Sequence, residues 1–207
     1  MAVHESQSLL LEMQVCRSRP FLGYAAPILR EAFCGDGPGW EADALYRRQI
    51  RVRRSLIRVD ADEVTYPAHV ILRYRLERAM IAGDLAPVDL PGAWSEALRS
   101  LLGVAPDNDR EGCLQDIHWY DGNWGYFPTY TLGALIAAQL FEAARRDVPE
   151  VTQAIAGGEF APLLVWLRER VHSKGSLLST DELVESATGR PLGSSSFERH
   201  LRERYLN

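Results

Sequence analysis

The chain of 207 residues is long enough to bury a substantial hydrophobic core. Its 28 acidic residues outnumber 23 lysines and arginines, and the formal charge of -5 argues against a dedicated nucleic-acid binder. Three scattered cysteines do not make a disulfide framework, and no apolar run approaches the roughly 20 residues of a membrane span. The first residues also lack the charged-then-apolar order of a secretory signal. We therefore expect a cytoplasmic protein without nucleic-acid or membrane partners.

Helical periodicity dominates the chain. Residues 56–62 are β-branched and mixed with aspartates, which indicates a short strand or an extended turn, and residues 104–127 are irregular. Capping-box patterns begin at Ser179 and Ser195. Without internal repeats or a low-complexity linker, the sequence predicts one all-α domain over 1–207 with at most a small β element. The predicted helices cover residues 5–18, 20–33, 40–55, 67–81, 91–103, 128–146, 159–173, 179–187 and 195–205.

The pair His4-Glu5 resembles the start of a zinc-binding H-E-x-x-H helix, in which two histidines four residues apart share one face. Position 8 is Ser8, so this pattern fails at its second histidine. The five histidines contain no pair spaced by four residues, and catalytic zinc usually needs three protein ligands. Considered alone, His4-Glu5 is most simply an exposed terminal pair.

Two further groups of residues carry possible chemistry. In residues 57–62 an arginine, Arg58, is accompanied by two aspartates, which indicates either a surface ion-pair network or a guanidinium held ready for a substrate carboxylate. In residues 112–130 one Gln, two Asp, one His, two Trp and three Tyr gather before an apolar helix. Such a segment is either a binding loop on a rigid scaffold or an aromatic plug of the core.

Taken in order, these groups resemble the signature blocks of the carboxypeptidase Taq family of zinc metallocarboxypeptidases. The blocks are residues 4–7 (HESQ), 57–62 (IRVDAD) and 112–119 (GCLQDIHW), and residues 62–67 and 125–133 also fit. The resemblance spans essentially the whole chain. It implies the C-terminal part of a zincin-like helical metallopeptidase that removes C-terminal amino acids from peptides.

The resemblance also implies roles for individual residues. Glu5 corresponds to the third zinc ligand of the family. Arg58 corresponds to the group that binds the α-carboxylate at the peptide C-terminus, with Asp60 or Asp62 orienting its guanidinium.

The third block supplies the remaining candidates. His118 and a tyrosine, Tyr130 or Tyr126, would stabilise the oxyanion of the tetrahedral intermediate. Gln115 and Asp116 would support these residues from behind. Family members are typically homodimers, and the resemblance implies the same association here.

Family members are more than twice as long as this chain, and their H-E-x-x-H helix precedes the part that matches. Because the 207 residues hold one of three zinc ligands and no general base, we expect the isolated chain to bind zinc weakly and to be inactive. Two alternatives stay open. One is a non-catalytic helical module for peptide binding or assembly, and the other is half of a split enzyme completed by a separate chain with the H-E-x-x-H segment.

Overall fold

The computed structural model describes residues 1–206, and it divides into two compact units. Unit 1 comprises Met1 and Val52–Thr131, and the described residues of unit 2 are 2–51 and 132–206. Both are built from helices and connecting loops, and no strand occurs in the described residues, which confirms the all-α prediction. The single domain over 1–207 stays a prediction.

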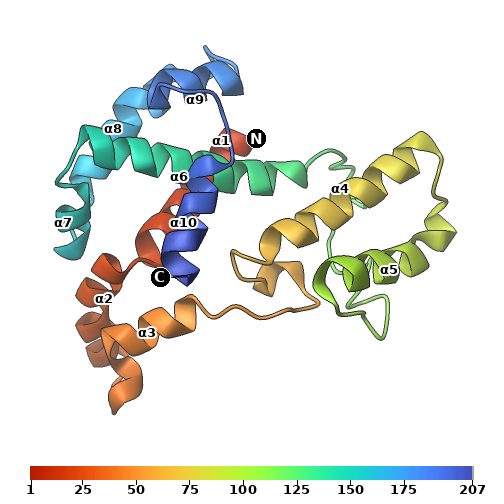
Figure 1. Cartoon of the computed structure of the whole chain (residues 1–207), viewed down its shortest axis with the longest axis horizontal. Coiled ribbons are helices and arrows are strands. Elements are labelled where there is room, and N and C mark those ends of the chain that lie inside the picture. The colour runs from red at the N-terminus through yellow and green to blue at the C-terminus, as the bar shows by residue number, and fades with distance from the viewer. Residues whose placement is uncertain (207) are drawn as a thin grey trace. The chain divides into compact units, whose positions relative to one another are not determined.

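Unit 2 surrounds the long helix α6, which begins in unit 1 and belongs to unit 2 from Leu132 onward (Figure 1). Its apolar and small side chains, such as Ile136, Leu140 and Ala144, are buried nearly all round and form the centre of the larger core. The helical elements of this unit are α1 (Ala2–Leu9), the π-helix η1 (Leu10–Cys16), α2 (Arg19–Ala32), η2 (Pro38–Trp40), α3 (Ala42–Gln49), α6 (Pro128–Asp147), α7 (Val151–Ala156), α8 (Ala161–Arg170), η5 (His172–Lys174), α9 (Thr180–Thr188) and α10 (Ser195–Tyr205).

Unit 1 is a pair of packed helices with an irregular segment across them (Figure 1). Leu72 and Leu76 pack with Trp94 and Leu98 in the smaller core. The helical elements are η3 (Arg58–Asp60), α4 (Tyr66–Ala82), η4 (Pro87–Asp89) and α5 (Leu90–Leu102). Residues 103–127 form turns and contain no α-helix, 3-10 helix or π-helix.

The third predicted helix is shorter than the sequence indicated. It covers Ala42–Gln49 rather than 40–55, and its C-cap is Ile50. Five arginines lie between positions 47 and 54, and like charges at helical spacing weaken a helix. The chain then continues without regular secondary structure, and the backbone N–H of Arg53 donates to the Asp62 carboxylate at 2.9 Å.

Three local predictions have clear outcomes. Residues 56–62 form no strand; Arg58–Asp60 make the 3-10 turn η3 between the extended residues Ile57 and Ala61, in agreement with the turn alternative. Helix α7 was not predicted. The capping box at Ser179 is confirmed, since its side chain accepts from the N–H of Glu182 and the glutamate bonds back. The box at Ser195 is wrong because Ser194 is the N-cap, and its hydroxyl donates to the carboxylate of Glu198 at 2.6 Å.

None of the helices in the described part of the chain combines the length and apolar character needed to cross a membrane.

Candidate functional site

Glu5 lies on α1, where close helix packing fixes its position within unit 2. A Cβ atom added to Gly133 of α6 would lie 2.7 Å from the Cβ of Glu5, so only glycine permits this approach. The neighbouring Ser6 is buried and donates to the Val3 carbonyl at 2.6 Å. Oε1 of Gln7 lies 2.9 Å from Nε2 of His172. The block at residues 4–7 therefore holds the Glu5 backbone on a rigid support.

Arg58 is the first residue of η3 and is almost completely buried, with 6% of its side chain exposed. Its Nε and Nη2 donate to one oxygen of Asp116 at 3.0 and 2.7 Å, and its Nη1 donates to the hydroxyl of Tyr66 at 2.8 Å. Its backbone N–H donates to Oε1 of Gln115 at 2.9 Å. The guanidinium is thus held by residues from the segment after α5 and from the start of α4.

A second arginine, Arg73 of α4, bonds to two of the same side chains, Asp116 and Gln115. Its Nε donates to the other oxygen of Asp116 at 2.6 Å, and its Nη2 donates to Oε1 of Gln115 at 2.8 Å. The Gln115 amide nitrogen in turn donates to three backbone carbonyls, which fixes its orientation. Arg73 is fully buried and lies over the ring of Trp94 at 4.5 Å. Sequence reasoning missed Arg73, because nothing in the sequence of α4 distinguishes it from the exposed arginines Arg75 and Arg78.

Mutual charge stabilises this cluster against the cost of burial. Burial by itself would raise the pKa of Asp116, but Arg73 and Arg58 hold that pKa below its ordinary value. Burial also opposes the charged form of Arg58, yet the hydrogen bonds and charge of Asp116 raise its pKa. Burial lowers the pKa of Arg73 to about 10, which still leaves it charged at neutral pH. One carboxylate therefore serves two charged guanidinium groups.

The irregular segment is pinned to α4 by a buried glutamate, Glu77. Its carboxylate accepts from Nε1 of Trp119 at 2.7 Å and from the backbone N–H of Gly125 at 2.5 Å. Trp119 in turn packs edge-on against Trp94 of α5. The aromatic segment is therefore both a core plug and the scaffold of candidate site residues, and the two interpretations of the sequence are compatible.

His118 and Tyr130 are in direct contact within unit 1. Nε2 of His118 lies 2.9 Å from the Tyr130 hydroxyl, and its Nδ1 is buried 4.0 Å from an Asp116 oxygen. Burial lowers the pKa of His118, so the ring is neutral at pH 7. Tyr126 packs beside both, with ring centroids 5.6 Å from His118 and 5.3 Å from Tyr130. The Tyr130 ring also lies 4.8 Å from the guanidinium carbon of Arg58.

The two aspartates nearest to Arg58 in sequence do not bond to its guanidinium in the described structure. Asp62 accepts from the backbone N–H groups of Val64 and Thr65 and from the Thr65 hydroxyl, so it caps the turn before α4. Asp60 is exposed. In the described residues the carboxylate bonded to Arg58 is that of Asp116, which corrects the expectation that Asp60 or Asp62 orients this guanidinium. Adjacency in sequence did not decide the pairing, because the 3-10 turn directs these side chains elsewhere.

His69 on α4 is a buried group that sequence reasoning did not single out. It is fully buried, and neither ring nitrogen has a hydrogen-bond partner in the described structure. Burial, followed by the charges of Arg73 and Arg58, lowers its pKa to about 4. The neutral imidazole of His69 therefore lies close enough to Arg73 and Arg58 for their positive charges to oppose its protonation.

Residues 1–205 match the sequence profile of the family described as Carboxypeptidase Taq (M32) metallopeptidase. The chain belongs to this family. The order of the three blocks in the sequence and the buried cluster around Arg58 are thus features of an M32 chain, and the resemblance inferred from the sequence is confirmed.

Curated relatives agree with this assignment. The chain is 44% identical over 205 residues to thermostable carboxypeptidase 1 of Thermus thermophilus, covering 99% of this chain and 40% of the relative. It is 39% identical over 208 residues to thermostable carboxypeptidase 1 of Pyrococcus furiosus, covering 100% of this chain and 41% of the relative. The chain thus spans about two fifths of the length of these M32 relatives.

Solved structures share the fold. Metallocarboxypeptidase 1 of Trypanosoma cruzi superimposes with a TM-score of 0.94 at 45% identity, covering all of this chain and 43% of the other. The M32 carboxypeptidase of Deinococcus radiodurans R1 gives a TM-score of 0.93 at 42% identity, covering 99% of this chain and 41% of the other. The helical fold is therefore that of a metallopeptidase family, and membership implies a metal ion.

Proposed function

We propose that this chain contributes the substrate-carboxylate site of a zinc-dependent carboxypeptidase, which releases C-terminal amino acids from peptides. The observation that carries the proposal is the state of the Arg58 guanidinium. A guanidinium has five N–H donors. Three of them are used by Asp116 and Tyr66, and one donor remains on each terminal nitrogen.

Two parallel donors on a fixed fork match the two oxygens of a carboxylate. Asp116 holds the guanidinium in place, and Arg73 and Gln115 hold Asp116 and the η3 backbone, so little side-chain freedom is lost when a ligand binds. The near-complete burial of Arg58 strengthens the attraction because water screens it less. A peptide with a free α-carboxylate is therefore the ligand that this group fits.

A further part of the proposal concerns the oxyanion that forms during peptide hydrolysis. The contact between His118 and Tyr130 supports this part. The imidazole and the phenol form a hydrogen-bonded pair, in which Nε2 of His118 donates or accepts according to the tautomer. We assign these residues, with Tyr126 as the alternative tyrosine, to binding the developing oxyanion of the scissile carbonyl. Donors directed at that oxygen lower the barrier because its charge grows in the transition state.

The metal of the family is proposed to be zinc, with Glu5 as one ligand. Within residues 1–206 no group of three or more His, Cys, Asp or Glu side chains could hold a metal ion. Glu5 fits a ligand role because carboxylate oxygen is an accepted zinc donor and its helix is rigidly supported by Gly133. When bound, zinc supplies a water of lowered pKa and polarises the scissile carbonyl.

The 207 residues contain no H-E-x-x-H motif, and we propose that by themselves they do not hydrolyse peptides. Turnover would need that segment, on the same polypeptide or on a separate chain. All the residues that hold the Arg58 guanidinium belong to this chain. This supports a second function for the isolated chain, as a peptide-binding or assembly module. Homodimerisation and a cytoplasmic location are further parts of the proposal.

Binding of matched peptides tests the carboxylate role. A short peptide with a free C-terminus should bind the chain, and the same peptide with an amidated C-terminus should bind far more weakly. Arg58→Ala should abolish this preference, since losing one partner of a buried charge pair costs roughly 2–5 kcal/mol. Arg75→Ala, an exposed arginine of α4, is the matched control and should leave the preference intact. Equal losses for the free and amidated peptides in Arg58→Ala would refute the role.

Peptidase assays test the proposal that the 207 residues alone do not hydrolyse peptides. A blocked dipeptide should be stable with the 207-residue chain alone and be cleaved when an H-E-x-x-H segment and zinc are added. Cleavage by the chain alone that a chelator abolishes would contradict the proposed inactivity.

A further inference from the structure

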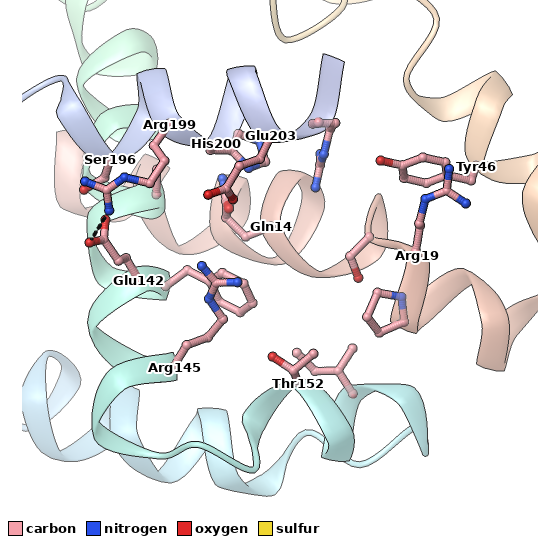
Figure 2. Close-up of a pocket in the computed structure, with 16 residues that line it drawn as sticks. Gln14, Arg19, Tyr46, Glu142, Arg145, Thr152, Ser196, Arg199, His200 and Glu203 are labelled. Atoms are coloured by element: carbon pink, nitrogen blue, oxygen red, sulfur yellow. Dashed lines mark hydrogen bonds and ion pairs between the residues drawn. The ribbon is translucent and has the colours of Figure 1, made fainter. Parts of the chain in front are cut away.

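Unit 2 contains a recess that the proposed carboxylate site does not use. It is a cavity of about 280 Å³ between side chains of η1, α2, α3, α6, α7 and α10 (Figure 2). All of its lining residues belong to unit 2, whereas the Arg58 cluster belongs to unit 1. Its walls carry both charged and apolar groups, as small-molecule sites do.

One buried donor in this cavity has no partner. Gln14 of η1 is 5% exposed, and its side-chain Nε2 makes no hydrogen bond in the described structure. Buried polar groups in proteins are almost always hydrogen-bonded, so an unpaired amide nitrogen in the wall of a cavity points to a ligand acceptor there. Figure 2 shows this side chain at the centre of the cavity wall.

Two charged groups of opposite sign face the same space. Arg145 rises from α6 and Glu203 descends from α10 on either side of Gln14 (Figure 2). Neither the Arg145 guanidinium nor the Glu203 carboxylate takes part in a hydrogen bond or ion pair within residues 1–206, although Arg145 lies over the Phe141 ring at 5.4 Å. Both residues are exposed, so a solute can reach them from water.

Three other charged side chains of the lining, Arg19, Glu142 and Arg199, are already paired. Arg199 donates to the Glu142 carboxylate at 2.7 Å, drawn as a dashed line in Figure 2, and Arg19 forms an ion pair with Asp43. The side chains that offer charge to a ligand without first breaking such a pair therefore include one cation and one anion. A simple anion at Arg145 would be repelled by Glu203, and a simple cation at Glu203 would be repelled by Arg145.

We propose that this cavity binds a free amino acid in its zwitterionic form. The α-carboxylate accepts from Arg145 and from the Gln14 amide, and the α-ammonium donates to Glu203. The apolar side chains of Phe141 and Ile155 line the same cavity and offer a surface for the amino-acid side chain. The volume of about 280 Å³ lies just below the usual range of ligand pockets, which suits one amino acid better than a peptide. This binding does not depend on the proposed peptidase function.

Calorimetric titration of the 207-residue chain with L-leucine tests the proposal. Its two matched analogues are 4-methylpentanoate, which lacks the ammonium group, and 3-methylbutylamine, which lacks the carboxylate. Leucine should bind at one saturable site, and each analogue should bind at least roughly tenfold more weakly, because one charge of the pocket is then unpaired. The titration is repeated with Arg58→Ala, so that leucine bound at the peptide site does not contribute.

Variants locate the site. Arg145→Gln and Glu203→Gln should each weaken leucine binding at least roughly tenfold. The matched controls, Arg202→Gln and Glu185→Gln, replace exposed charges on α10 and α9 that do not line the cavity, and they should leave binding unchanged. Circular dichroism establishes that each variant is folded.

Three results would overturn the proposal. They are the absence of saturable leucine binding, equal binding of 4-methylpentanoate and leucine, and leucine binding that survives both pocket substitutions. The second result would assign the cavity to simple anions. If leucine binding disappears only in Arg58→Ala, leucine occupies the proposed peptide site and the cavity is not its site.

Discussion

Replacing Asp116 with asparagine removes one negative charge from between two buried arginines while keeping the size of the side chain. The exposed fractions of the three side chains are 9% for Asp116, 6% for Arg58 and 0% for Arg73. Removing one partner of a buried ion pair typically costs about 3–5 kcal/mol, because the remaining charge stays buried without compensation. Here one substitution leaves two guanidinium groups in that state. We expect Asp116→Asn to lower the free energy of unfolding by about 3–5 kcal/mol.

Urea denaturation followed by circular dichroism measures this loss at pH 7. Asp60→Asn is the matched control, since Asp60 is exposed, and it should change the free energy of unfolding by less than about 0.5 kcal/mol. If the two variants lose similar stability, the shared carboxylate does not stabilise the cluster and the reasoning is refuted.

The contribution of Asp116 to the free energy of unfolding depends on pH in a defined direction. The pKa of Asp116 is lower in the folded chain than in the unfolded chain, so its contribution is present above the unfolded value of about 3.9. It is lost as the pH falls from there through the lower folded-state pKa. The stability gap between the wild-type chain and Asp116→Asn should therefore be constant from pH 7 to about pH 5 and narrow only in stronger acid. A gap that closes already near pH 6 would assign the effect to another group.

Three further predictions follow from the packing and the titrating groups. Gly133→Ala should destabilise the fold by about 1–3 kcal/mol because the added Cβ meets the Cβ of Glu5, whereas Gly92→Ala, with open space around it, should not destabilise it; thermal melts of both variants compare them. Since the folded-state pKa of His69 is lowered to about 4, stability should fall between about pH 6.5 and 4 as the unfolded chain takes up the proton, and His69→Leu should flatten this slope in urea titrations at several pH values. An unchanged slope would show that His69 does not titrate as described. In a reconstituted enzyme, Tyr130→Phe should lower kcat by about 10²–10³-fold with little change in KM, and undiminished kcat would transfer the oxyanion role to another group.

The sequence predicted most of the fold because the signals are local. Helices α4 and α6 each have a proline in the first turn, and α4 ends at Gly83 in the left-handed conformation; such start and stop signals act over a few residues. The errors are also local in origin. The arginine-rich tail of α3 follows helical periodicity but does not form a helix, and α7 is too short for a periodic pattern to show.

The sequence also identified the members of the site, through blocks whose order is characteristic of a family. It did not identify which carboxylate serves which arginine. Arg58 pairs with Asp116, which lies 58 residues further along the chain, rather than with its neighbours Asp60 and Asp62. Arg73 escaped notice because its importance arises only from sharing that carboxylate.

The sequence by itself determined the all-α class, most helix boundaries and the family, because periodicity, caps and ordered motifs are properties of neighbouring residues. The tertiary structure decided the charge pairing around Asp116, the burial of His69 and the cavity lined by Gln14, Arg145 and Glu203. Each of these depends on burial, which removes water as a competing partner and makes the choice of hydrogen bonds energetically significant. Burial in turn is created by segments that are distant in the chain and adjacent only once it has folded.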